Sequence, residues 1–280
     1  MKSRLILILT ILYLFCNSIS GQEKRNINPI AILGAFNMEI EMLKDSIQNK
    51  RETNVCGLSV TTGTLYGQEV VIAYTGMGKV NAAMTTTLIV NRFRPAKVIF
   101  TGIAGRLNPE LHPGDIVIGK MTVQHDLNVV YRDSTTNFTV YSPITDEKVP
   151  VYFPADNELL LLTQVITKKV SLLAYPVNKS EYQPRITTGI IATGDAFVAS
   201  SIKNEEIHAR FNADAVEMEG AAIAQICYYM NTPCIIIRSI SDSADEQAET
   251  DIMKYLEIAA RNSNLLIIGM LQEMEKEFNP

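Results

Sequence analysis

Short apolar runs alternate with amphipathic segments along most of this chain. The apolar runs predict buried strands, at residues 29–35, 98–101, 115–123, 186–192, 215–216 and 234–237. Apolar residues spaced three and four apart predict helices, at residues 38–48, 79–93, 159–170, 202–211, 221–230 and 250–275. This alternation predicts an α/β fold with a mixed, largely parallel sheet and helices on both of its faces.

Two segments depart from the alternation. Residues 58–65 and 69–74 flank the short turn Tyr66-Gly67-Gln68, and they predict a hairpin. Residues 127–155 mix proline, tyrosine and small polar residues and predict a long loop, which in a compact domain is usually functional or mobile. N-glycosylation sequons begin at Asn137 and Asn178, and whether they are used depends on a host that the sequence does not identify.

The first twenty residues have the pattern of a signal peptide. Lys2 and Arg4 precede an apolar run over residues 5–15, and Ser18-Ile19-Ser20 has the small residues of a cleavage site. The run is too short to span a bilayer as a stable helix. We therefore expect cleavage near residues 20–21, export to the periplasm or outside the cell and no stable membrane anchor, with a retained anchor as the alternative. Residues 21–280 then form a single domain.

The charge and the cysteine content of the chain argue against several classes of protein, namely nucleic-acid-binding, disulfide-rich and zinc-binding proteins. The formal net charge is −5 and no basic run occurs, which argues against nucleic acid as a partner. The mature chain keeps Cys56, Cys227 and Cys234, which have neither the number nor the spacing of a disulfide framework or zinc site. We expect Cys227 and Cys234 to pack in the core, and no metal or other cofactor.

Acidic residues follow two of the predicted strands. Val216 precedes Glu217-Met218-Glu219, and the run at 234–237 leads to Asp242. Open α/β sheets build their sites at the carboxyl ends of strands, where acids can accept ribose hydroxyls or transfer protons to a base. The order acid, helix, strand, acid predicts two neighbouring parallel strands, with Glu219 and Asp242 side by side.

The two acidic stretches, VEMEGAA at 216–222 and RSISDSAD at 238–245, resemble the 5′-methylthioadenosine/S-adenosylhomocysteine nucleosidases of the purine nucleoside phosphorylase and nucleosidase superfamily. The resemblance runs in order through further motifs at 34–39, 75–80, 101–105, 113–117, 125–126 and 193–198. It implies a three-layer α/β/α architecture with a partly barrel-like sheet. It also implies hydrolysis of the N-glycosidic bond of methylthioadenosine, adenosylhomocysteine or a related 5′-modified adenosine, with release of adenine.

This reaction needs a proton on the purine and a water molecule directed at the anomeric carbon. The resemblance maps the acid that protonates purine N7 onto Asp242, whose pKa burial would have to raise. Ser241 and Ser243 can orient Asp242 by hydrogen bonds. Glu39 matches the general base for the water, and the donors of Arg238 can orient Glu39 or that water.

The remaining candidates bind the nucleoside. Glu219 would accept hydrogen bonds from the ribose hydroxyls and offset positive charge on the sugar. Met218 would lie against the sugar, and Glu217 would add a supporting contact. The backbone at Ala104 and Gly105 can approach the sugar closely, because glycines flank this loop.

Phe197 and Val198 match the residues that stack on the purine and bond its edge. Taken without the resemblance, Phe197 fits a core position, and each acid fits a solvated loop or, for Glu39, a helix start. Family members are dimers in which a loop of one subunit closes the 5′-pocket of the other, and residues 127–155 occupy that place. We therefore expect a homodimer with a 5′-pocket built from Phe36, Met77, Val129, Phe197 and Met218.

Three residues depart from the family pattern: Ile103 stands in place of Ser, Arg106 in place of Gly, and Phe36 in place of Met. These departures leave the preferred 5′-substituent open. The turn at 34–39 places a carboxylate where phosphorylases of this superfamily clamp phosphate, which favours hydrolysis. The alternatives are another purine nucleosidase, a phosphate-dependent phosphorylase, or a non-catalytic storage-type relative, which would not need Glu39, Glu219 or Asp242.

Overall fold

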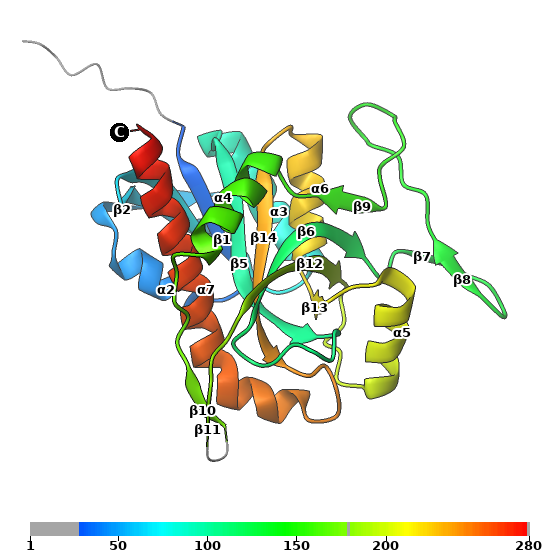
Figure 1. Ribbon diagram of the computed structural model, residues 1–280. Coiled ribbons are helices and arrows are strands. Elements are labelled where there is room, and N and C mark those ends of the chain that lie inside the picture. Colours follow the sequence, from blue (N-terminus) through cyan, green and yellow to red (C-terminus); the bar gives the residue numbers. More distant parts are fainter. Residues whose placement is uncertain (1–27, 178–179, 279–280) are drawn as a thin grey trace, which may run out of the picture.

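A computed structural model describes residues 28–177 and 180–278. The predicted signal peptide and the sequon at Asn178 lie outside these residues. Figure 1 shows a sheet between two layers of helices, which confirms the predicted α/β/α architecture. The helices are α2 (Asn37–Asp45), α3 (Lys79–Phe93), α4 (Asn157–Thr167), α5 (Ser201–Phe211), α6 (Gly220–Tyr229) and α7 (Ala248–Phe278).

The main sheet has the strand order β13-β12-β6-β14-β5-β1-β4-β3-β2. Its strands are β1 (Ile30–Gly34), β2 (Gln48–Val55), β3 (Leu58–Leu65), β4 (Gln68–Tyr74), β5 (Lys97–Arg106), β6 (Ile116–Gln124), β9 (Tyr152–Pro154, paired with β6), β12 (Ile186–Thr193), β13 (Ala215–Glu217) and β14 (Cys234–Asp242). The pairings of β1 with β4 and β5, of β5 with β14, and of β12 with β6 and β13 are parallel. The pairings of β14 with β6 and of the β2-β3-β4 meander are antiparallel, so the sheet is mixed.

β13 also pairs with the end of β5, at Gly105 and Arg106. This contact closes β13, β12, β6, β14 and β5 into a barrel, in agreement with the partly barrel-like sheet that the resemblance implies. The predicted neighbourhood of β13 and β14 is wrong, because β5 separates them by pairing with β14 along its length and with β13 at its end.

Two apolar layers hold the helices to the sheet. One lies between the sheet and α3 and α6, with Ile89, Phe100 and Ile223 among its buried members. The other lies under α2, α4 and α7, and includes Leu43 and Leu266. Cys227 and Cys234 are buried and unbridged, as expected for core residues, whereas Cys56 is exposed.

Some helices and strands begin or end at other residues than predicted, where the strand buries polar residues or lies exposed at the edge of the sheet. β14 continues to Asp242 because its polar residues Arg238, Ser239, Ser241 and Asp242 are buried. β5 continues past Gly102 because its end pairs with both β14 and β13. The helix predicted over 38–48 ends at Asp45, and β2 follows it. β2 is almost entirely exposed at the edge of the sheet, so no apolar pattern marks it.

The segment 127–155 is less irregular than expected. It contains β9 and a hairpin formed by β7 (Asn128–Val130) and β8 (Thr135–Asn137), which Figure 1 shows projecting from the body. A second small hairpin joins β10 (Tyr175–Val177) to β11 (Ser180–Tyr182). Across the described ranges, no helix combines the length and the hydrophobicity required to cross a membrane.

Candidate active site

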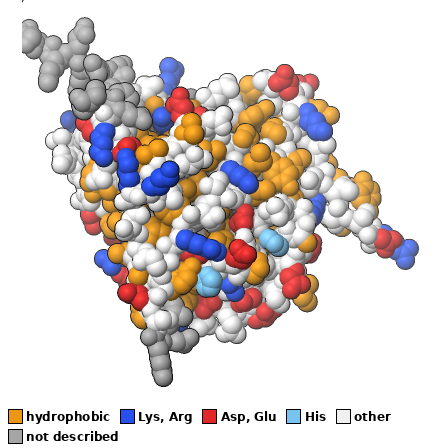
Figure 2. Space-filling view, in the orientation of Figure 1, with side chains coloured by type: hydrophobic (Ala, Val, Ile, Leu, Met, Phe, Trp, Pro, Cys, Tyr) orange, Lys and Arg blue, Asp and Glu red, His pale blue; other side chains and the backbone are white. Residues whose placement is uncertain are grey.

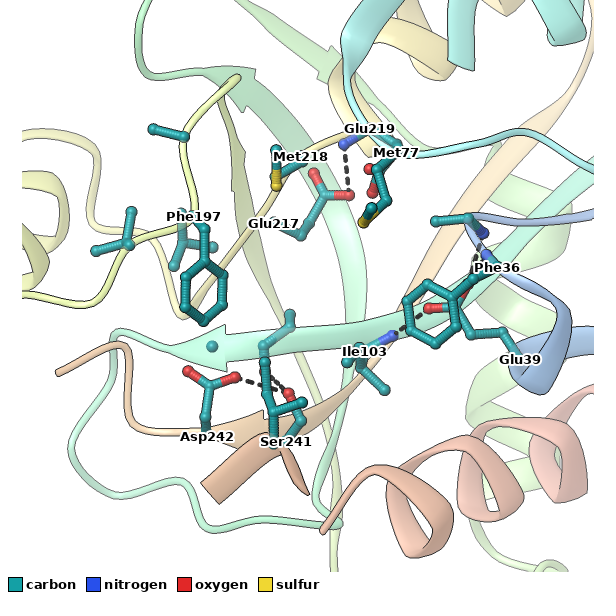
Figure 3. Close-up of a pocket in the computed structure, with 17 residues that line it drawn as sticks. Phe36, Glu39, Met77, Ile103, Phe197, Glu217, Met218, Glu219, Ser241 and Asp242 are labelled. Atoms are coloured by element: carbon teal, nitrogen blue, oxygen red, sulfur yellow. Dashed lines mark hydrogen bonds between the residues drawn. The ribbon is translucent and has the colours of Figure 1, made fainter. Parts of the chain in front are cut away.

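One cavity opens at the carboxyl ends of the strands, as expected for an α/β sheet. It collects side chains from the loops after β1, β4, β12 and β13, from the ends of β5 and β14, and from α7 (Figure 3). The lining residues are Ala35, Phe36, Glu39, Met77, Ile103, Ala104, Gly105, Ala196, Phe197, Val198, Val216, Glu217, Met218, Glu219, Ser241, Asp242 and Ile252.

Arg238 lies in β14 and is completely buried beside this cavity. Its Nη2 donates hydrogen bonds to Glu217 and, at 3.2 Å, to Glu219 Oε2. Its Nη1 lies 3.9 Å from Glu39 Oε1, and its Cζ lies 4.0 Å from the centroid of the Phe100 ring. Three carboxylates therefore surround one buried cation, and the cluster has excess negative charge when all three are ionised.

Glu217 is the carboxylate that pairs most directly with Arg238. It also accepts the backbone N–H groups of Glu219 at 3.0 Å and of Gly220 at 2.8 and 2.9 Å, and the hydroxyl of Thr193. These donors saturate Glu217 at the start of α6, where the helix dipole also favours a negative charge. Glu217 is thus a fixed anion that holds both Arg238 and the backbone of Glu219.

Glu39 lies in the first turn of α2 and is 1 % exposed. Its Oε2 accepts N–H from Ala35 at 2.5 Å and Phe36 at 3.1 Å, and its Oε1 accepts N–H from Ile103 at 3.0 Å. Burial raises the pKa of Glu39 to about 7, although Arg238 and the backbone donors oppose this shift. A rigidly held carboxyl group with a pKa near neutrality suits a general base.

Glu219 follows β13 and is also buried. Its Oε1 accepts the N–H of Gly78 at 2.8 Å, while Oε2 accepts from Arg238. Burial and the adjacent Glu217 carboxylate raise the pKa of Glu219 to about 7, against the opposing effect of Arg238. Only part of its hydrogen-bonding capacity is used, so the carboxylate can still accept hydroxyl groups from the cavity.

Asp242 ends β14 on a different wall of the cavity from Glu219 (Figure 3). The two acids are therefore not side by side, because the strands that carry them are separated by β5. Ser241 Oγ donates to Asp242 Oδ2 at 2.7 Å, and the Ala244 N–H donates to Oδ1 at 2.8 Å. Burial raises the pKa of Asp242 in spite of these two bonds.

Two glycines of β5 make room for these acids. A Cβ at Gly102 would collide with Arg238 Nη1 and the carboxylate of Glu39, and one at Gly105 would lie 2.8 Å from Asp242 Oδ1. Since real Cβ atoms are not found so close to other heavy atoms, both positions require glycine. The motif at 101–105 thus serves the site chiefly through its missing side chains and the Ile103 N–H.

The structure brings most of the predicted site residues together. The cavity is lined by Phe36, Glu39, Met77, Ala104, Gly105, Phe197, Val198, Met218, Glu219, Ser241 and Asp242, with Arg238 buried behind them. Val129 does not line the cavity of its own chain, because it lies in the projecting β7–β8 hairpin. Ser243 was expected to orient Asp242, but the Ala244 N–H occupies that role.

Several contributors were not predicted. Ile252 enters the cavity from α7, and nothing in its local sequence marks it. Thr193 holds Glu217 and also accepts the N–H of Ala221 at 2.8 Å; its place in the 193–198 motif is the signal that could have drawn attention to it. Glu217, expected to be a minor supporting contact, is the main partner of Arg238.

Comparison with known proteins agrees with this geometry. Residues 29–272 match the family model of the phosphorylase superfamily. A 5′-methylthioadenosine/S-adenosylhomocysteine nucleosidase of Bacillus cytotoxicus is 36 % identical over 247 residues, which cover 88 % of this chain and 99 % of that protein.

Solved structures give the same result. The nucleosidase of that name from Neisseria meningitidis, in complex with methylthio-immucillin-A, is 34 % identical with a TM-score of 0.75, over 88 % of this chain and 100 % of that one. A futalosine hydrolase of Helicobacter pylori is 30 % identical with a TM-score of 0.74, over 88 % and 98 %. The chain belongs to the 5′-methylthioadenosine/S-adenosylhomocysteine nucleosidase family of the phosphorylase superfamily.

Burial of Glu39 should lower the stability of the fold in the pH range where this carboxyl group is ionised. A carboxyl with an ordinary pKa of 4.5 and a folded-state pKa of about 7 loses folding free energy as pH rises between these values. We expect Glu39→Gln to raise the free energy of unfolding at pH 8 by up to about 3 kcal/mol, at 1.36 kcal/mol per pKa unit. The gain should shrink as the pH falls and vanish below about pH 4.5.

Denaturant melts at pH 8 and pH 5 measure this difference. Glu41→Gln, on the exposed side of the same helix, is the matched control and should show no such gain. A Glu39→Gln protein that is equally destabilised at both pH values would contradict the argument.

Proposed function

We infer that this protein hydrolyses the N-glycosidic bond of 5′-methylthioadenosine and S-adenosylhomocysteine, releasing adenine. The observation that carries this conclusion is the placement of three buried acids with raised pKa values around one cavity, namely Glu39, Glu219 and Asp242. Relatives at 36 % identity bear the name of this activity over nearly their whole length.

Asp242 acts at the purine end of the cavity. Burial raises the pKa of Asp242 and so favours the protonated form that a general acid requires, while Ser241 and the Ala244 N–H fix the direction of its carboxyl group. Donating that proton to the base turns adenine into a neutral leaving group, with the electrons of the breaking C–N bond retained by the purine. Phe197 and Val198 lie on the neighbouring loop, where they can contact the face and edge of the base.

Glu39 and Glu219 act at the sugar. Glu219 accepts the ribose hydroxyls and offsets the positive charge that develops on the ring. Glu39, held by three backbone N–H groups, removes a proton from a water molecule as that water attacks the anomeric carbon. A phosphate dianion at this position would be repelled by Glu39, which favours water over phosphate as the nucleophile.

A futalosine-type nucleoside is a second candidate substrate. The Helicobacter pylori structure that matches this chain over 88 % of its length bears the name futalosine hydrolase. The same acids would serve the glycosidic bond of either compound, so only the group at the 5′-position distinguishes them. Substrate assays should therefore include futalosine beside the two sulfur-containing nucleosides.

Purified mature protein should release adenine from methylthioadenosine in phosphate-free buffer, with no stimulation by added phosphate. Asp242→Asn cannot supply the proton, and it should lower kcat by a factor on the order of 10²–10⁴ while keeping the fold. Asp245→Asn, three residues further along and outside the cavity, is the control and should remain active. Retention of more than half the wild-type rate by Asp242→Asn would overturn the role of this acid.

Variants of Glu39 and Glu219 should differ in whether they lose inhibitor affinity or the rate of the chemical step. Glu39→Gln should lower kcat on the order of 10²–10⁴-fold yet still bind methylthio-immucillin-A, because its part is to activate water. Glu219→Gln should weaken binding of the same inhibitor by about tenfold, because this residue holds the ribose. Titration calorimetry compares the two; if Glu39→Gln were the poorer binder, the roles would be wrongly divided.

We further propose that the protein is exported after cleavage near residues 20–21 and works as a homodimer. The sequence of residues 1–20 supports export. Exposed apolar side chains support assembly: Val80 and Met84 on α3 and Tyr228 on the adjacent α6. Figure 2 shows hydrophobic side chains gathered over α6 and β9, and others on the projecting β7–β8 hairpin.

The mouth of the cavity also supports assembly. Met77 is 62 % exposed and Phe197 is 47 % exposed, although both line the cavity. We propose that the β7–β8 hairpin of a second copy, carrying Val129, covers this mouth and completes the 5′-pocket with Phe36 and Met218. An apolar cover of this kind would exclude water from the 5′-substituent.

Met84→Glu should convert the dimer to a monomer, because a charge would be buried in an apolar interface. Met253→Glu, an equally apolar and 83 % exposed site on α7, is the control and should stay dimeric in sedimentation. Replacing residues 129–137 by a short glycine linker should change the ratio of kcat/KM for methylthioadenosine and adenosylhomocysteine more than it changes adenine binding. A fully active wild-type monomer, or an unchanged ratio, would refute this arrangement.

A further inference from the structure

The segment that carries Phe197 is held in place by few interactions. It runs from Gly194, at the end of β12, to Ser200, which caps α5, and residues 195–197 are exposed. Val198 packs into the core beyond Phe197. Within the described residues, the hydrogen bonds that hold positions 195–199 are all made by Asp195. The orientation of Phe197 therefore depends on what Asp195 is bonded to.

Asp195 is bonded to two partners from other parts of the chain. Its backbone N–H donates to Asp126 Oδ2 at 2.9 Å, and its own Oδ1 accepts the N–H of Lys79 at 2.8 Å. Lys79 Nζ in turn donates to Asp126 Oδ1 at 2.7 Å and to Gln124 Oε1 at 3.1 Å. Asp126, Lys79 and Asp195 thus form a closed ring of three contacts, which we name the latch.

The latch also reaches the ribose side of the cavity. Lys79 is the first residue of α3, and the preceding N–H, that of Gly78, donates to Glu219. Two successive N–H groups at this helix start therefore bind two carboxylates, that of Glu219 in the cavity and that of Asp195 in the segment that carries Phe197. Negative charge is favoured at a helix start, so both contacts reinforce the position of α3.

The burial and charge of Lys79 and Asp126 indicate that these two side chains form an ion pair of more than surface strength. The side chains of Lys79 and Asp126 are only 19 % and 30 % exposed. Burial acts to raise the pKa of Asp126, but the bonds from Lys79 and from the Asp195 N–H outweigh it and lower the pKa below its ordinary value. The ion pair is therefore partly shielded from water, where its contribution exceeds that of an exposed pair.

We propose that Asp126, held by Lys79, is a positioning residue that fixes Phe197 for stacking on the purine. Asp126 does not line the cavity, and it would act through Asp195. Because stacking on the base is present before and during bond cleavage, its loss should raise KM and leave kcat nearly unchanged. This proposal rests on the nucleosidase function proposed above.

Asp126→Asn tests the proposal with little change in volume. An amide has one acceptor oxygen, so it can keep the bond from Lys79 or the bond from Asp195 N–H, but not both charged contacts. We expect the KM for methylthioadenosine to rise about tenfold and kcat to stay within about twofold. Hydrogen–deuterium exchange of the peptide spanning residues 194–200 should become about tenfold faster.

Two variants of Lys79 extend the test. Lys79→Met should reproduce the effects of Asp126→Asn, and the double variant should be no worse than either single one, because both break the same ring. Lys79→Arg keeps the charge and should retain most of the wild-type KM. Glu206→Gln is the control, because it breaks the exposed ion pair with Lys203 on the following helix α5 and should change neither KM nor exchange.

The results of these experiments distinguish a failure of the positioning proposal from a failure of the proposed function. A folded Asp126→Asn with unchanged KM, or one that loses kcat alone, would overturn the positioning role. Unchanged exchange at residues 194–200 would overturn it as well. If the wild type releases no adenine, the proposed function fails, whereas the exchange measurement still decides whether Asp126 holds the segment. Thermal melts identify any variant that does not fold, and Lys79→Met then replaces Asp126→Asn in the comparison.

Discussion

The buried ion pair between Arg238 and Glu217 is the interaction on which the rest of the site depends. Burying a guanidinium is costly unless it is paired and hydrogen-bonded, and Glu217 provides both the charge and a rigid position. The charge of Glu217 is thereby offset by the charge of Arg238. Glu39 and Glu219 lie farther from the guanidinium of Arg238, so its charge stabilises their ionised forms less. Burial is therefore the largest influence on their pKa values, which it raises.

This division of charge gives chemically different acids from similar residues. Glu217 is saturated with donors and fixed, whereas Glu39 and Glu219 have pKa values near 7. Asp242 lies apart from the cluster, where burial, and to a smaller extent the charges of Asp251 and Asp245, favour its protonated form. The proposed base, ribose acceptor and acid thus differ in the distance of each carboxyl group from one cation and in the burial of each group.

The backbone of β5 connects these groups. It pairs with β14 along its length and with β13 at its end, so it brings the elements carrying Asp242, Arg238 and Glu219 to one place. Its glycines leave space for Glu39, Arg238 and Asp242, and the Ile103 N–H binds Glu39. The opposite side of the cavity is more open, since Met77 and Phe197 are exposed and the loop of Phe197 is tethered through Asp195.

Local sequence determined the element types, because buried strands and amphipathic helices leave apolar patterns of different period. The sequence also identified the acids Glu39 and Asp242 and the motifs around them, because the proposed chemistry requires carboxyl groups. Tertiary structure alone decided the rest. The closure of β13 on β5 separated Glu219 from Asp242, because barrel closure depends on pairing between distant strands and not on chain order. It also decided that Glu217 is the nearest partner of Arg238 and that Glu39 lies farther away, at 3.9 Å. In addition, it decided that Ile252 reaches the cavity from α7 and that Val129 lies outside the cavity. These facts depend on distances between residues far apart in the chain, which no local pattern of hydrophobic and polar residues encodes.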